Sequence, residues 1–417
     1  MTTQRTRASQ PRPRTAGIGL ALAGGGPLGG IYEVGALLAL ADSIRGLDLC
    51  ELDVYVGVSS GGFVAAGLAN GISPSQMYRL FIEEGSEAAM KPALFLRPAV
   101  SELVRRAGLL PRLALHASSR YLRAPRRSGV MESLATLGRA LPTGVFDAAA
   151  VDAFLRDLFA APGRTNDFRA LRRPLYLVAT ALDTGASVVF GSAGFDHVPI
   201  SRAIEASSAL PGLFPPVEID GVLYVDGALN KTLHASLALE RDVSLLLCVN
   251  PLVPFDAALA QTRRGIDARR LDHGGLPRVL SQTFRAIIRS RMQAGMAAYG
   301  REYPHADVIL FEPAREDADM FFANIFSYAQ RERICALAYA ATRADLLRRA
   351  DALAPCLRRH GLALDEARLC DARRQVADAL CDPRPLHASP RRPAMREAAR
   401  DLGHALDHLE RHLAALR

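Results

Sequence analysis

The sequence contains no tryptophan and only two lysines, Lys91 and Lys231, although lysine and arginine together number 51. Arginine therefore carries almost all of the positive charge, and the formal net charge is +8. A basic chain can bind nucleic acid or an anionic membrane. Aromatic residues make up 6% of the sequence, which gives little support for stacking on nucleic-acid bases. We expect no nucleic-acid partner, and a membrane surface fits the charge better.

Metal-binding and disulfide patterns are lacking as well. The cysteines form no Cys-x-x-Cys pair and no cluster with histidine at zinc-ligand spacing; they are Cys50, Cys248, Cys335, Cys356, Cys370 and Cys381. This usage is typical of unpaired thiols in a reducing compartment. We expect a cytoplasmic location, with peripheral contact to an anionic membrane, and no metal site.

The chain also lacks an uninterrupted membrane-spanning run. Residues 17–41 are mostly apolar over a length that would span a bilayer, but Pro27, Glu33 and a glycine-rich centre interrupt them. A buried strand, a tight turn and a buried helix explain the same residues. Residues 1–16 carry four arginines and no acid, without the apolar core of a signal peptide. They are expected to form a disordered basic arm.

Alternating strand and helix patterns indicate an α/β fold. Residues 18–23 read as a buried strand and 31–44 as a helix, and the same order recurs at 53–57 and 63–69. Two strand-turn-helix units in succession imply a parallel sheet. Further β-rich runs are at residues 175–182, 187–190, 217–219, 222–225, 243–249 and 308–311, and helical spacing extends from 318 to about 350.

One segment is both basic and amphipathic. Residues 97–127 contain eight arginines against the single acid Glu102, interleaved with leucine, valine and tyrosine. Either a solvated helical face packed on the core or a lid that docks on membranes fits this pattern.

The glycine-rich turn after the first strand has three interpretations. Gly24, Gly26 and Gly29 formally fit the dinucleotide fingerprint G-x-G-x-x-G. The acids near the expected ribose position, Asp42 and Asp48, do not clearly end a second strand. The turn is equally compatible with an oxyanion hole, made by backbone N–H groups, or with a mere tight turn.

Ser59 has the surroundings of a nucleophile on a sharp turn. Gly57 lies two residues before it and Gly61 two after, which fits G-x-S-x-G between a strand and a helix. Strand and helix approach so closely there that a Cβ at either glycine would clash. Ser60 lacks this flanking pair, because Val58 occupies the earlier place.

Asp226, followed by Gly227 and Ala228, ends a later strand and offers a carboxylate that would act as base. Together with the glycine turn and Ser59, it indicates ester hydrolysis through a covalent acyl-enzyme. A serine-aspartate-histidine triad is the rival, with His234, His273 or His305 following Asp226.

These motifs resemble the patatin-like phospholipase family over residues 17–250. The resemblance rests on four blocks in order: Gly24-Gly25-Gly26-Pro27-Leu28-Gly29, Gly57-Val58-Ser59-Ser60-Gly61, the run from Ala206 to Pro216, and Asp226-Gly227-Ala228. It implies a three-layer α/β/α sandwich with a mainly parallel central sheet and a Ser-Asp dyad without histidine. By resemblance, Ser59 is the nucleophile, Asp226 is the base, and the oxyanion hole is the backbone of Gly24, Gly25 and Gly26. Many members have Arg or Lys where Pro27 and Leu28 stand, so the head-group preference does not carry over.

The resemblance implies a serine acyl hydrolase that cleaves lipid carboxylic esters, of phospholipase A or lysophospholipase type, without metal or cofactor. Its partner would be a membrane phospholipid or another acyl-ester lipid. A non-lipid esterase, a thioesterase and a polyester depolymerase are alternatives, and a dinucleotide- or lipid-binding protein without hydrolysis is a more distant one. We expect an acyl-hydrolase domain at residues 17–250, its continuation with a helical cap at 251–350, and a helical C-terminal tail with a proline-rich linker at 351–417.

Overall fold

The computed structural model describes residues 17–83, 97–99, 108, 142–231, 233–264, 275–317 and 328–380. Within these residues, the strands of the main sheet pair in the order β6-β7-β4-β3-β1-β8-β9, and β5 also pairs with β4. Five strands are parallel to one another: β1 (Gly17–Leu22), β3 (Val54–Val58), β4 (Leu175–Ala181), β8 (Val243–Val249) and β9 (Asp307–Phe311). The antiparallel members are β5 (Ser187–Phe190), β6 (Val217–Ile219) and β7 (Val222–Asp226).

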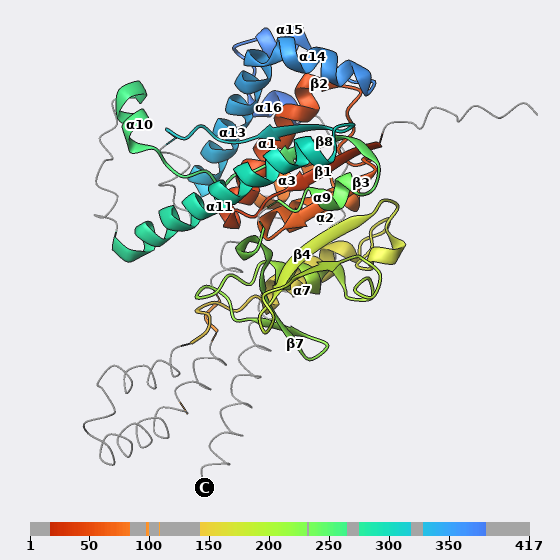
Figure 1. Ribbon diagram of the computed structural model, residues 1–417, viewed down its shortest axis with the longest axis vertical. Helices are drawn as coiled ribbons and strands as arrows, with labels where there is room; N and C mark the ends of the chain where they lie inside the picture. The colour runs from red at the N-terminus through yellow and green to blue at the C-terminus, as the bar shows by residue number, and fades with distance from the viewer. Residues whose placement is uncertain are drawn as a thin grey trace, which may run out of the picture.

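Helices cover both faces of the sheet (Figure 1). Strand residues alternate between the faces: Leu20 and Leu22 belong to one apolar cluster, and Ala21 to another. The first cluster includes residues of α1 (Gly26–Ser43), α2 (Ser60–Ala69) and α13 (Tyr328–Arg348), and the second includes residues of α9 (Ser236–Leu239) and α11 (Gly275–Glu302). The predicted three-layer α/β/α architecture with a mainly parallel sheet is therefore confirmed.

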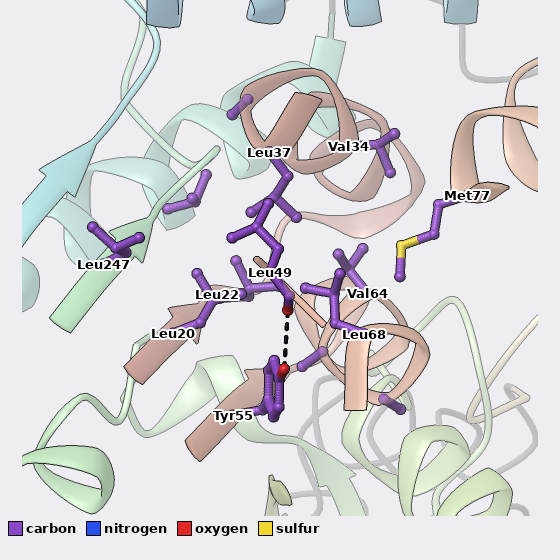
Figure 2. Close-up of a cluster of buried hydrophobic side chains, with 14 of the residues drawn as sticks. Leu20, Leu22, Val34, Leu37, Leu49, Tyr55, Val64, Leu68, Met77 and Leu247 are labelled. Atoms are coloured by element: carbon purple, nitrogen blue, oxygen red, sulfur yellow. Dashed lines mark hydrogen bonds between the residues drawn. The ribbon is translucent and has the colours of Figure 1, made fainter. Parts of the chain in front are cut away.

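The larger cluster lies between the strands and α1 (Figure 2). Tyr55 is fully buried there, and its hydroxyl donates to the Leu49 carbonyl at 3.0 Å and accepts from the Leu52 amide at 3.0 Å. Burial raises the pKa of Tyr55 far above its ordinary value, so the phenol remains neutral. The polar end of this core residue is satisfied by backbone groups.

The strand-turn-helix interpretation of residues 17–41 is confirmed, since β1 is followed directly by α1. Across the described ranges, we find no helix whose length and hydrophobicity would suffice to cross a bilayer. The basic segment 97–127 lies outside the described residues except for 97–99 and 108, and so do residues 381–417.

The remaining elements surround the sheet. The capping box of Ser73 and Gln76 starts α3 (Pro74–Phe81), with Pro74 in the first turn. The others are α7 (Ala149–Phe159), α8 (Ile200–Ser207), α10 (Ala257–Arg264), α14 (Ala350–Arg359), α15 (Glu366–Cys370), α16 (Val376–Ala379) and a small pair of strands, β2 (Ile44–Arg45) with β10 (Ala363–Leu364).

Asp42 ties the C-terminal helices to α1. Its carboxylate accepts from Arg374 at 2.6 Å, from Arg368 at 3.1 Å and from the Tyr339 hydroxyl at 2.8 Å. Burial by itself would raise the pKa of Asp42, but the hydrogen bonds from Arg374 and Tyr339 hold it below its ordinary value. One of the acids considered for a ribose is thus occupied in an ion-pair network.

Candidate active site

Ser59 occupies a strained turn between β3 and α2. Its φ is +52° and its ψ is −124°, a backbone conformation that residues with side chains rarely adopt. Ser207 holds this turn from α8: the Ser59 amide donates to the Ser207 hydroxyl at 2.8 Å, and that hydroxyl donates to the Val178 carbonyl at 2.6 Å. The tertiary structure therefore supports a backbone geometry that the local sequence alone would not favour.

The flanking glycines are required by close packing, as predicted. A Cβ at Gly57 would lie 2.6 Å from the Gly61 carbonyl oxygen, and a Cβ at Gly61 would lie 2.6 Å from the Leu22 carbonyl oxygen. Both contacts are with backbone, so no side-chain rotation would relieve them. The turn thus brings Ser59 directly against the end of β1.

Asp226 meets Ser59 because β3 and β7 lie along the same edge of β4. Ala179 pairs with both β5 and β7, which places those strands on opposite edges of β4, and Leu177 pairs with both β3 and β5. β3 and β7 therefore run toward each other on the edge opposite β5. Val58 pairs with Val178 and Asp226 with the next residue, Ala179, so the two strand ends meet head to head.

The Asp226 carboxylate is buried and hydrogen-bonded. It accepts from the Ala228 amide at 2.8 Å, and the Ser59 hydroxyl is its side-chain hydrogen-bond partner. Burial raises the pKa of Asp226 to about 6, and these two hydrogen bonds partly oppose the rise. The group is consequently more basic than an ordinary aspartate, yet still largely ionised at neutral pH.

The glycine turn packs against both residues. A Cβ at Gly24 would lie 3.1 Å from the Cβ atoms of Ser59 and of Ala228, so Gly24 fits between the serine turn and the aspartate turn. Gly26 has a φ of +63° and begins α1, and the amide of Gly29 donates to the Gly25 carbonyl at 3.1 Å. Amides before Gly29 precede the helical hydrogen-bond ladder, where N–H groups and the positive end of the helix dipole attract negative charge. This arrangement is chemically suited to an oxyanion.

A largely apolar cavity of about 140 Å³ opens over Ser59. Its apolar lining comes from α1, α2, α7 and the segment after α8, and includes Ile31, Phe63, Val64, Val151, Leu210, Leu213 and Phe214. The hydroxyls of Ser60 and Ser208 also line it, buried and without a hydrogen-bond partner in the described part of the chain. Such a cavity accommodates an apolar chain and a few polar groups.

Arg331 is a cavity residue that sequence reasoning missed. It comes from α13, is almost fully buried, and donates from Nη1 to the Phe81 carbonyl at 3.1 Å. A cation thus faces the cavity although Pro27 and Leu28 provide none. No spacing pattern singles out Arg331 in a helix that also contains Arg333, Arg343 and Arg348.

The two described histidines of the rival triad, His234 and His305, have partners other than the Asp226 carboxylate. His234 is hydrogen-bonded to the backbone of Lys231 and Gly227, and burial, helped by the charge of Lys231, lowers its pKa to about 4. It is not among the residues that line the cavity. His305 stacks edge-on against Tyr303, and His273 lies outside the described residues.

The acids of the dinucleotide alternative have structural partners. Asp48 accepts from the Cys50 amide at 2.9 Å. A further acid of this region, Asp53 just before β3, accepts from the Ile18 amide at 2.8 Å and pairs with Arg173 at 3.2 Å. With Asp42 in its arginine network, the glycine turn faces Ser59 and Ala228 rather than a ribose-binding acid.

One group among the described residues has donor atoms close enough for a metal: Asp307, Cys356 and His360, within 4.8 Å of one another. Asp307 accepts from Arg359 at 2.8 and 2.9 Å and pairs with His360 at 2.8 Å. The arginine already neutralises the carboxylate, so the group is explained as an ion-pair cluster at the beginning of β9.

Solved structures similar to this chain include two bacterial proteins. Among solved structures, the chain is similar to VipD from Legionella pneumophila, at 16% identity over 80% of this chain and 66% of that one, with a TM-score of 0.37. It is also similar to the type III effector protein ExoU, at 16% identity over 81% of this chain and 54% of that one, with a TM-score of 0.33. The chain therefore spans roughly half to two thirds of the length of these proteins.

The sequence model described as "Patatin-like phospholipase" matches residues 20–239, somewhat more than half of the chain. All residues of the glycine turn, the serine turn and the aspartate turn lie within this match. The chain belongs to the patatin-like phospholipase family.

Proposed function

We propose that this chain is a lipid acyl hydrolase of phospholipase A or lysophospholipase type that uses a Ser59-Asp226 dyad. The observation that carries the proposal is the buried Asp226 carboxylate, which has the Ser59 hydroxyl as its hydrogen-bond partner and a pKa of about 6. A base directly on the serine hydroxyl needs no intervening histidine.

In the proposed reaction, Asp226 takes the Ser59 proton as the serine oxygen attacks the ester carbonyl. The resulting oxyanion receives hydrogen bonds from the amides at the start of α1, where Gly24, Gly25 and Gly26 form the turn. The C–O bond to the leaving alcohol breaks, and Asp226 returns the proton to that alcohol. The acyl group is then bound to Ser59 as an ester.

Deacylation uses the same groups. Asp226 takes a proton from water as the water oxygen attacks the acyl-enzyme, and the serine oxygen leaves with that proton. The fatty acid departs and Ser59 is restored. The apolar cavity over Ser59 suits the acyl chain.

Arg331 is proposed to attract the anionic head group, in the role that a cation in the glycine turn would otherwise have. It faces the cavity with the Ser60 and Ser208 hydroxyls. A guanidinium has several N–H donors in one plane and so matches a phosphate well.

A fluorophosphonate probe tests the proposal. Wild-type protein is expected to be labelled at Ser59 and Ser59→Ala to remain unlabelled; a wild type that resists the probe would remove the enzyme hypothesis. His234→Ala and His305→Ala are expected to retain turnover of a chromogenic acyl ester, whereas a loss as large as that of Ser59→Ala would replace the dyad by a triad. Product analysis on mixed phospholipid vesicles distinguishes lipid from non-lipid ester substrates.

A further inference from the structure

Helix α11 exposes an apolar stripe at its beginning. Val279, Leu280, Phe284 and Ile287 are between 43% and 49% exposed. Leu280, Phe284 and Ile287 follow one another at four- and three-residue spacing, so they lie on one face of the helix. Single exposed apolar residues are ordinary, but a contiguous group of large ones marks an interaction surface.

The same helix is strongly basic. It contains five arginines and no lysine or aspartate, and its only acid is Glu302 at the last position. Arg289 lies 4.0 Å from Glu312, and Arg285 donates to the Val253 carbonyl at 3.1 Å. An apolar stripe on an arginine-rich helix has the character of helices that lie in the interface of an anionic bilayer.

The beginning of α11 contacts the segment that follows β8, near the carboxyl ends of β1 and β8 where the glycine turn lies. β8 is parallel to β1, and Pro251, just after β8, contacts the positions of Gly25 and Gly29. Gln282 then exchanges hydrogen bonds with the backbone of Phe255, at 2.7 and 3.1 Å. Figure 1 shows the first part of α11 projecting away from the sheet at this end.

Arg291 joins α11 to the turn that follows Asp226. Its Nη1 donates to the Asn230 carbonyl at 2.6 Å and to the Leu229 carbonyl at 3.2 Å. Ile287 precedes Arg291 by one helical turn, a distance of about 6 Å along the axis. The Ile287 end of the stripe is therefore one helical turn from the arginine that contacts the segment after the aspartate turn.

We propose that this stripe of Leu280, Phe284 and Ile287 inserts into the surface of an anionic phospholipid bilayer and brings the cavity over Ser59 to its lipid substrate. The delivery of a lipid substrate to Ser59 rests on the proposed lipid hydrolase function, but binding to the membrane does not depend on catalysis. A symmetric contact between two copies would place the arginines of one α11 near those of the other. An anionic membrane instead complements them.

The absence of tryptophan makes a direct test available. In a Ser59→Ala background, which leaves the lipid intact, Phe284→Trp introduces a single tryptophan into the stripe. Its emission is expected to shift to the blue on phosphatidylcholine vesicles that contain about 30% phosphatidylglycerol, as the indole enters the interface. Leu347→Trp, at a similarly exposed position on α13, is the matched control and is expected to show no shift. No shift at position 284 would overturn the proposal.

A second measurement uses the triple variant Leu280→Ser, Phe284→Ser, Ile287→Ser. We expect its partition onto the same vesicles to fall at least about tenfold, while Leu182→Ser combined with Leu347→Ser binds as the parent does. Unchanged binding of the triple variant would contradict the proposal, and so would a parent that sediments as a dimer and becomes monomeric in the triple variant.

With Ser59 restored, the triple variant should hydrolyse a soluble short-chain ester at the wild-type rate. This arm separates the two proposals. If the triple variant loses vesicle binding but still hydrolyses the soluble ester, the docking surface is supported. If the wild-type protein does not hydrolyse the soluble ester, the hydrolase proposal is refuted, and the vesicle-binding measurement alone decides the docking proposal.

Discussion

The Ser207 hydroxyl lies between the backbone amide of Ser59, at 2.8 Å, and the Val178 carbonyl, at 2.6 Å. It thereby joins the end of α8 to the serine turn and to the central strand β4. Ser59 has a positive φ, which is a strained backbone conformation for a residue with a side chain. We infer that Ser207 is a positioning residue, which acts through Ser59.

Replacing Ser207 by alanine should therefore affect turnover more than binding. The Ser59 amide loses its acceptor, and we expect kcat on a chromogenic ester to fall about 10- to 100-fold with little change in KM, with a loss of stability of about 1–3 kcal/mol. Ser201→Ala removes another buried hydroxyl of α8, bonded to Asn166, and should lower stability while kcat is retained. Equal effects of the two variants on kcat would assign Ser207 a merely structural role.

Protonation of Asp226 should lower kcat/KM at acid pH, which gives the pH profile an acid limb. Only the carboxylate form accepts the Ser59 proton, so kcat/KM is expected to fall tenfold per pH unit below about pH 6, the pKa that burial gives this group. Asp226→Asn should lower kcat about 10²- to 10⁴-fold and abolish that limb in the residual activity. Kinetics of the two proteins between pH 4 and 8 measure this, and an unchanged limb in the variant would exclude Asp226 as the base.

The same burial means that the ionised Asp226 carboxylate lowers the free energy of unfolding. Because its pKa is about 6 when folded and near its ordinary value of 3.8 when unfolded, the folded chain binds the proton more tightly, and stability falls as pH rises through this interval. Asp226→Asn should raise the free energy of unfolding by about 1–3 kcal/mol at pH 8 and by little at pH 4. Urea unfolding at both pH values tests the sign. Asp183→Asn, in an exposed turn, should change stability by less than about 0.5 kcal/mol at either pH.

Gly25 and Gly30 provide a matched pair in the glycine turn and α1. A Cβ at position 25 would lie 2.5 Å from Pro251 Cγ and 2.7 Å from Gly29 Cα, whereas at position 30 the nearest atom is 3.6 Å away. Gly25→Ala should displace the turn and lower kcat by at least about 100-fold. Gly30→Ala should keep activity within about threefold and stabilise α1 by up to about 1 kcal/mol. Similar activities for the two variants would argue against the turn as oxyanion hole.

Arg331→Gln tests the proposed head-group cation. We expect kcat/KM on an anionic phospholipid to fall about tenfold, with turnover of a neutral soluble ester nearly unchanged. Arg333→Gln, at an exposed position of the same helix, is the control. A parallel loss on both substrates would indicate that Arg331 supports the cavity rather than the head group.

Local patterns were sufficient for much of the site. The strand-turn-helix order and the small residues around Ser59 depend on backbone geometry over a few residues, and such geometry restricts the residue types directly. The convergence of Gly24, Ser59 and Asp226 was inferred from their order and from family resemblance, not from any physical rule in the sequence. Their roles in catalysis are predictions for the experiments above.

By itself, the sequence determined the alternating α/β layers and the positions where only glycine fits, because both follow from side-chain periodicity and local backbone geometry. Only the tertiary structure decided that β3 and β7 end head to head on one edge of β4, that Ser207 supports Ser59, and that Arg331 faces the cavity. The tertiary structure also decided the α11 stripe, because the same apolar residues could lie in a core, and only the packing of α11 leaves them exposed. Strand register and helix packing join residues far apart in the chain, and no local spacing encodes those contacts.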